Sequence, residues 1–262
     1  MVCAVAVKSD PGGFPQRRLS EVPAVTPTQM REIQRTAQED YGVDILQITE
    51  NAGRAAARLA LEMLGGRGRG QVVLILAGGG NKGAAGLVAA RTLSNWGINA
   101  EPILADVQSE SSFAVRRELN ILQISGVVEP SDLEATEITL EDQLNRADLI
   151  IDALVGYGLA GPPVGISAAA TDLAVNSRKP ILALDVPTGV NAATGDVSVP
   201  AIRACTTLIL DLPKRGMLEL SARPNVGELY LADLGIPVSV HERLGIATAS
   251  IFNEGPLVRL KR

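Results

Sequence analysis

Short apolar runs alternate with helical segments along most of this sequence, and this alternation constrains the fold more than any other feature. Stretches with helical composition or periodicity cover residues 87–96 and 113–124. Runs of strand length occupy residues 72–76, 99–104, 148–154, 181–184, 206–210 and 228–231. Short buried strands that alternate with helices are typical of a parallel sheet covered on both faces. The sequence therefore predicts an α/β protein with a Rossmann-like, doubly wound and mostly parallel sheet.

Two further helices are predicted ahead of the first strand. Thr26-Pro27-Thr28-Gln29 has the form of a capping box with proline at the first helical position. A second helix, rich in alanine and leucine, is predicted over residues 44–64, where two glycines end it. We predict that both helices pack on the sheet within one domain over residues 25–240. Residues 1–24 are predicted to form a flexible tail, and residues 241–262 a C-terminal extension.

The composition argues against several classes of function. The 262 residues carry a net charge of -5 and only 3% are aromatic, so the basic footprint and stacking platforms of nucleic-acid binders are absent. The one histidine, His241, which we expect at the surface, argues against a catalytic triad or a multi-histidine metal site. Two cysteines favour a reducing compartment, and we predict a cytoplasmic location. No stretch of about 18 residues is apolar enough to suggest a membrane partner.

The first candidate site is the glycine-rich segment of residues 77–86, which follows a predicted strand and opens a helix. In doubly wound folds, ligands bind beyond the carboxyl ends of the strands. Gly78-x-Gly80-x-x-Gly83 matches the dinucleotide fingerprint, and Asp106 follows where a ribose ligand is expected. The alternative is a tight strand-to-helix turn that binds no ligand. A P-loop is excluded because Lys82 precedes a glycine rather than serine or threonine.

Two aspartates mark the ends of two other predicted strands. Asp152 lies inside an apolar run and is followed by a second glycine-rich loop, and Asp185 ends the run of residues 181–184. A buried carboxylate needs a partner, because an unpaired buried charge is costly. Each aspartate alone could cap backbone amides or form a turn. Two of them beside a glycine-rich loop favour one shared polar site.

These three loops resemble those of the NAD(P)H-hydrate epimerase family, the YjeF N-terminal domain type. The resemblance also rests on Glu50-Asn51-Ala52-Gly53, on residues 86–91 and 213–216, and on residues 227–237. It implies a Rossmann-like fold, a homodimer and an isomerase of nicotinamide nucleotide repair. Such an enzyme interconverts the R and S epimers of hydrated NADH and NADPH (NADHX and NADPHX), and an NAD(P)HX dehydratase then restores the S form. The resemblance also implies a potassium ion close to the substrate and no organic cofactor beyond that substrate.

The resemblance implies a set of site residues, and the glycine-rich loop departs from the family at three of them. Asp152 and Thr188 are the implied potassium ligands, and Asp185 is a substrate-binding residue. The implied substrate-binding loops comprise Asn81, Lys82, Gly83, Ala84 and Ala85, and then Gly156, Tyr157, Gly158, Leu159, Ala160, Gly161 and Pro162. The family loop usually reads Gly-Pro-Gly-Asn-Asn-Gly-Gly-Asp-Gly. Lys82 here replaces a potassium-binding asparagine, Ala84 a glycine, and Ala85 the aspartate that serves as acid and base.

These departures leave three functional hypotheses. The first is an active epimerase in which Asp185 takes over catalytic acid/base work, since losing a positioned acid typically costs about 10²–10⁴-fold in rate. The second is a catalytically impaired member that acts as a nucleotide-binding or protein-interaction module. The third is a dehydrogenase that binds ribose through Asp106.

The two lysines near these loops allow further alternatives. The Lys82 ammonium could replace the potassium ion and bridge Asp152 and the Thr188 hydroxyl. Alternatively, Lys82 points to solvent or pairs with a ligand phosphate. Lys214 either meets a substrate phosphate or lies in a solvated loop.

Overall fold

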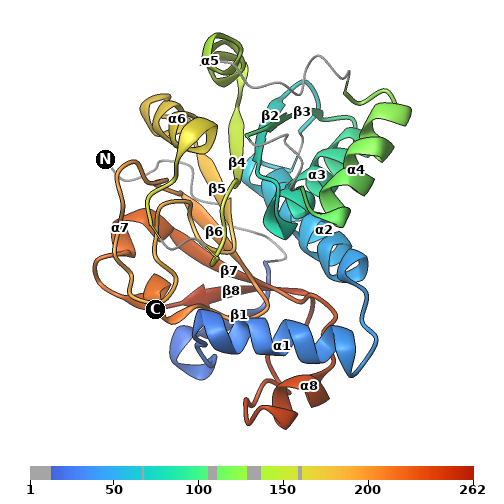
Figure 1. The fold of residues 1–262 in the computed structure, drawn as a ribbon, viewed down its shortest axis with the longest axis vertical. Helices are drawn as coiled ribbons and strands as arrows, with labels where there is room; N and C mark the ends of the chain where they lie inside the picture. Colours follow the sequence, from blue (N-terminus) through green and yellow to red (C-terminus); the bar gives the residue numbers. More distant parts are fainter. Residues whose placement is uncertain (1–12, 67, 106–110, 129–136, 159–160) are drawn as a thin grey trace.

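The strands of the computed structural model form one twisted sheet with helices on both sides (Figure 1). The structure describes residues 13–66, 68–105, 111–128, 137–158 and 161–262. The strand order in this part of the chain is β1-β8-β7-β6-β5-β4-β2-β3, and only β7 and β8 pair antiparallel. The strands are β1 (Gln16–Arg18), β2 (Val72–Ala77), β3 (Asn99–Leu104), β4 (Leu149–Ala153), β5 (Ile181–Leu184), β6 (Thr206–Leu210), β7 (Glu228–Ala232) and β8 (Leu257–Lys261).

The central strands are apolar along their whole length because both faces of the sheet are covered. On β2, Val73 and Ile75 pack into one core, while Leu74 and Leu76 pack into the other. The first core lies under α2 (Ile45–Met63), α3 (Asn81–Asn95) and α4 (Phe113–Ile124). The second lies under α5 (Glu137–Arg146) and α6 (Gly165–Asn176), on the opposite side of the sheet (Figure 1). This confirms the predicted doubly wound α/β fold.

The two N-terminal helices begin at side-chain caps. Thr26 accepts a hydrogen bond from the Gln29 amide at 3.1 Å, and the Gln29 side chain accepts one from the Thr26 amide at 2.9 Å. This capping box starts α1 (Pro27–Glu39), as predicted. Asp44 caps α2 in the same way. α1 packs beside α8 (Val238–Arg243), and α2 packs on α3.

Both ends of the described chain contribute strands outside the predicted range of residues 25–240. β1 pairs parallel with β8, and β8 pairs with β7. The short elements η1 (Leu19–Glu21), η3 (Arg215–Leu218) and α7 (Arg223–Val226) complete the described chain. A strand of three residues shows no periodicity in the sequence, which explains why β1 differs from the expected tail.

The prediction of a surface histidine is wrong. His241 is only 3% exposed, because its side chain on α8 lies against Asp211, the residue directly after β6. There, His241 Nε2 lies 3.0 Å from Asp211 Oδ2. Burial alone would lower the pKa of His241, but the hydrogen bond and charge of Asp211, with smaller contributions from the Pro237 backbone and Asp233, together outweigh burial and raise the pKa.

The strand order creates a crevice between β2 and β4. The chain runs from β2 to β3 on one side and then crosses back to β4 on the other side of β2. The loops that follow β2 and β4 therefore diverge at the carboxyl edge of the sheet, where doubly wound folds bind their ligands.

Candidate active site

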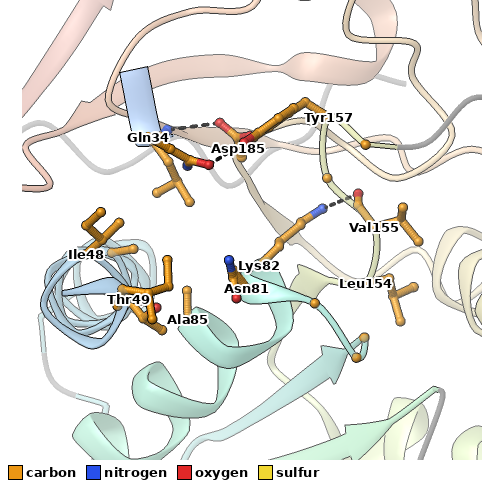
Figure 2. A pocket seen from close by; sticks show the side chains of 18 of the residues that line it. Gln34, Ile48, Thr49, Asn81, Lys82, Ala85, Leu154, Val155, Tyr157 and Asp185 are labelled. Carbon is orange, nitrogen blue, oxygen red and sulfur yellow. Dashed lines mark hydrogen bonds between the residues drawn. The ribbon is translucent and has the colours of Figure 1, made fainter. Parts of the chain in front are cut away.

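A cavity of about 440 Å³ opens at this carboxyl edge. Its volume falls in the range of small-molecule sites, roughly 300–1,000 Å³. The start of α3 and the loop after β4 form one wall, and α1 and α2 form the opposite wall (Figure 2). Asp185, Leu210 and Lys214, from the ends of β5 and β6, complete the lining. The predicted loops therefore meet around one cavity.

The glycines of the first loop allow a close approach of backbone to backbone. A Cβ atom at Gly83 would lie 1.8 Å from the carbonyl oxygen of Gly78, and one at Gly78 would lie 2.1 Å from that of Leu154. Both distances are far below van der Waals contact, so no side chain fits. α3 begins after Gly80, whose lack of a side chain leaves the first-turn amides without a side-chain cap. The loop is thus both a tight turn and part of a cavity wall.

Lys82 extends from the first turn of α3 toward the loops that follow β4 and β5 (Figure 2). Its Nζ donates to the carbonyl oxygens of Val155 and Val186, each at 2.9 Å. The same nitrogen lies 3.2 Å from Asp152 Oδ2 and 3.4 Å from Thr188 Oγ1. Lys82 therefore does not point to solvent; its ammonium joins three loops at the sheet edge.

Asp152 is fully buried, and protein groups satisfy its carboxylate on every side. The backbone amides of Leu154 and Thr188 donate to it at 3.2 and 2.8 Å, and the Thr188 hydroxyl donates at 2.7 Å. Lys82 supplies the opposite charge. Asp152 thus caps backbone amides and also holds a cation, so both roles considered for it from the sequence are present.

The implied potassium ion does not fit this arrangement. The oxygens of Asp152, Thr188, Val155 and Val186 converge on one point at the carboxyl edge, and Lys82 Nζ lies at that point. A metal ion and an ammonium nitrogen cannot share this space. We therefore derive no chemical step through potassium.

Asp185 and Lys214 form a second buried ion pair, in the wall of the cavity. Lys214 Nζ contacts Asp185 Oδ1 and donates to the Leu210 carbonyl at 2.8 Å. Asp185 is 3% exposed and Lys214 1% exposed, so the solvated loop considered for Lys214 is wrong. Asp185 has a φ of 60°, a left-handed conformation that asparagine and aspartate tolerate better than most residues.

Tyr157 covers this ion pair from the loop after β4. Its ring centroid lies 5.5 Å from Lys214 Nζ, within the range of a cation–π contact. Its hydroxyl donates to Gln34 Oε1 of α1 at 2.5 Å (Figure 2). Burial, and then the nearby Asp185 carboxylate, raise the pKa of Tyr157 to about 12, so the phenol is neutral at physiological pH. Tyr157 therefore links the two walls above Asp185.

The remaining predicted site residues divide into three groups. Asn81, Ala85, Gly156 and Gly158 line the cavity with Lys82, Tyr157 and Asp185. Gly83 and Ala84 are buried behind the lining, and Gly161 and Pro162 do not line it. Leu159, Ala160 and Asp106 lie outside the described residues. The lining residues that sequence reasoning missed come from α1, α2, α6, the end of β6 and the loop after β7: Arg31, Gln34, Ile45, Ile48, Thr49, Ser167, Leu210 and Leu234.

Comparison with known proteins identifies the family to which this site belongs. The profile of the family described as YjeF-related protein N-terminus matches residues 45–216. The chain belongs to this YjeF-related family. A relative from Dehalogenimonas lykanthroporepellens named NAD(P)H-hydrate epimerase is 40% identical over 247 residues, which cover 92% of this chain and 95% of the relative.

Two other YjeF-related comparisons bear on length and fold. A protein from Thermofilum pendens named bifunctional NAD(P)H-hydrate repair enzyme Nnr is 34% identical, over 84% of this chain but only 42% of its own length. The crystal structure of yeast ynu0, YNL200c, matches with a TM-score of 0.80 at 24% identity. That match covers 91% of this chain and all of the yeast chain, which supports the fold. Among the described residues, no helix has the length and apolar character needed to cross a membrane.

Proposed function

We propose that this YjeF-related protein is an NAD(P)H-hydrate epimerase, which interconverts the R and S epimers of NADHX and NADPHX. The observation that carries this proposal is the Asp185–Lys214 pair, which places a carboxylate and an ammonium in the wall of a ligand-sized cavity. Family membership and the names of the relatives support the same reading.

Epimerisation requires acid/base chemistry at the C6 hydroxyl of the hydrated nicotinamide ring. In the ring-opening route, the hydroxyl gives its proton to a base as the bond between C6 and N1 breaks, and N1 receives a proton from an acid. Closure on the other face of the aldehyde reverses both transfers. In the route through water loss, the acid protonates the departing hydroxyl, and the base takes a proton from water that adds to the other face. Asp185 and Lys214 supply one base and one acid for either route.

The other walls of the cavity give this chemistry its setting. The uncapped first turn of α3 presents backbone amides and a positive dipole end to the cavity, which suits the substrate diphosphate. Tyr157, held by Gln34, covers the ion pair and limits its access to water. The reaction needs no organic cofactor beyond the substrate itself.

A second candidate function is a catalytically impaired, nucleotide-binding member of the family. The observation that favours it is Ala85, which lines the cavity between Thr49 and Asn81 but cannot transfer a proton (Figure 2). A chain of this kind keeps the pocket and acts through ligand sensing or a protein partner.

The two functions differ in an epimer-exchange assay. Purified protein is mixed with the R epimer of NADHX, an S-specific dehydratase and ATP, and NADH recovery is compared with that from dehydratase alone. The epimerase proposal predicts recovery above the spontaneous rate, and the Ala85→Asp variant is expected to increase it by up to about 10²-fold. No recovery from the native chain, with recovery from Ala85→Asp, would favour the impaired member. Circular dichroism of both proteins controls for folding.

The proposed partners follow from the same reaction. An NAD(P)HX dehydratase consumes the S epimer, and the bifunctional relatives extend well beyond the region that matches this chain. We expect a homodimer, as the family resemblance implies, and light scattering of the purified protein measures this directly.

A further inference from the structure

We infer that the Lys82 ammonium is a built-in monovalent cation, so that this chain needs no alkali-metal ion at the carboxyl edge of its sheet. The inference rests on the proposed function for its link to the substrate site and extends that function. The arrangement of atoms around Lys82 can nevertheless be tested without measuring turnover. The end of β4 with its following loop, and the loop after β5, contribute oxygens to one point, and the Lys82 nitrogen from the start of α3 occupies that point.

The number of acceptors around Nζ requires the charged form of Lys82. The carboxylate of Asp152 and the carbonyl groups of Val155 and Val186 can only accept hydrogen bonds. Three such acceptors lie within 3.2 Å of Nζ. An ammonium has three N–H donors, whereas a neutral amine has two and would direct its lone pair at one of these oxygens. The arrangement therefore matches a cation.

The surrounding charges support the same state. Burial is the largest influence and leaves the pKa of Lys82 below its ordinary value, while the Asp152 carboxylate and then the more distant Asp185 oppose this effect and favour the ammonium. Asp152 is 0% exposed, and a neutral Lys82 would leave its charge without compensation inside the protein. The Thr188 hydroxyl donates to Asp152 and turns its own oxygen toward Nζ, at 3.4 Å.

This use of Lys82 leaves none of its donors for the substrate. All three N–H groups have protein acceptors, so Lys82 does not pair with a substrate phosphate. Its role is to position the loops around the cavity. Val186 directly follows Asp185, so the bond from Nζ to the Val186 carbonyl also fixes the backbone beside the proposed base. Because the ammonium is covalently attached to the chain, it cannot dissociate. The loops around the cavity therefore keep their arrangement whatever ions are present.

The test is thermal unfolding in KCl, NaCl and choline chloride at equal ionic strength. We expect the native chain to melt at the same temperature in all three salts. The Lys82→Asn variant, which introduces an amide oxygen as ligand and removes the ammonium, should melt roughly 10 °C lower in choline chloride. Potassium should restore several degrees of that loss, since an ion that binds only the folded state stabilises it. Lys82→Met, which offers no ligand, is the matched control and should show the same loss with less recovery.

Several outcomes would overturn the inference. A potassium-specific rise in the melting temperature of the native chain would show that an ion binds there beside Lys82. A Lys82→Asn variant as stable as the native chain in choline chloride would show that the ammonium is dispensable. If both variants fail to fold, the comparison of salts on the native chain still decides. Turnover is measured separately: ion-independent melting without NADH recovery contradicts the proposed function alone.

Discussion

The Asp185–Lys214 pair permits a test in which stability and catalysis are separated. Both side chains are almost fully buried, so solvent does not screen their interaction. Removing one partner of a buried ion pair leaves an uncompensated charge and costs about 3–5 kcal/mol, whereas replacing both partners is often close to neutral. For a chain of this size, 1 kcal/mol shifts the melting temperature by roughly 2–4 °C. Each single variant should therefore melt roughly 6–20 °C lower, and the double variant close to the native temperature.

The substitutions are chosen to keep the local structure. Asp185→Asn preserves the shape of the side chain and tolerates the φ of 60° at that position. Lys214→Met keeps the length of the side chain under Tyr157 but removes the charge. In the epimer-exchange assay, all three variants should lose about 10²–10⁴-fold in rate, because each single variant lacks one of the two proposed acid/base groups and the double variant lacks both. If turnover is detected in the Ala85→Asp variant and not in the native chain, the same comparison is made in the Ala85→Asp background.

The double variant decides the outcome. If it melts near the native temperature and still catalyses epimer exchange at the native rate, the pair is structural and our assignment of acid and base is refuted. If it melts normally and is inactive, loss of folding cannot explain the loss of activity. Recovery of stability in the double variant also reports whether the charges compensate each other.

Two further predictions concern α1 and α8. Arg31 lines the cavity, and none of the ion pairs in the described part of the chain includes it, so its guanidinium is suited to a substrate phosphate. Arg31→Gln should weaken NADPH binding by about two- to fivefold in a fluorescence titration. The control is Arg35→Gln, which should bind like the native chain because the native Arg35 guanidinium pairs with glutamates on α1. Equal NADPH affinities for Arg31→Gln and the native chain would contradict this role of Arg31. Because the pKa of His241 is raised in the folded state, protonation of His241 stabilises the fold. This stabilisation is fully present below the unfolded-state pKa of about 6.5, and it is lost as the pH rises through the folded-state pKa. In urea titrations, the native protein should therefore exceed His241→Gln in unfolding free energy by more at pH 6 than at pH 9. A difference that does not change with pH would refute this role of the His241–Asp211 pair.

Much of the fold could be predicted because the local sequence patterns agree with the secondary structure that forms. The central strands are continuous apolar runs, and Thr26 with Gln29 forms the capping box that starts α1. β1 could not be predicted, because its three residues Gln16–Arg18 gain their pairing from β8 rather than from any pattern of their own. The burial of His241 likewise depends on Asp211, which is 30 residues away in the sequence.

The residues of the candidate site that lie at strand ends could be predicted from the sequence, whereas those on helix faces could not. Asp152 lies near the carboxyl end of β4, and Asp185 and the glycine-rich loop follow two other parallel strands, so the topology alone brings them to one edge. The burial of Lys214 depends on the side chain of Asp185, and nothing around Lys214 in the sequence signals that partner. Gln34 reaches Tyr157 from α1, and a helix that packs across a cavity leaves only an ordinary amphipathic pattern.

The presence of two buried ion pairs at one cavity argues for a ligand-related role rather than a structural one. Within each pair, Asp152–Lys82 and Asp185–Lys214, the two charges compensate each other, and none of the four side chains belongs to the hydrophobic core cluster. Apolar residues of similar volume often replace buried ion pairs with no loss of stability. A chain that had lost all use for this cavity would gain nothing from holding four buried charges in and behind its walls. The family resemblance implies a carboxylate where this chain has Ala85, whereas Lys82 supplies the same single positive charge as the implied potassium ion. The loss of that carboxylate alone therefore leaves less negative charge around a diphosphate-bearing substrate. This change in charge favours nucleotide binding, as expected of a chain that has kept a use for its cavity.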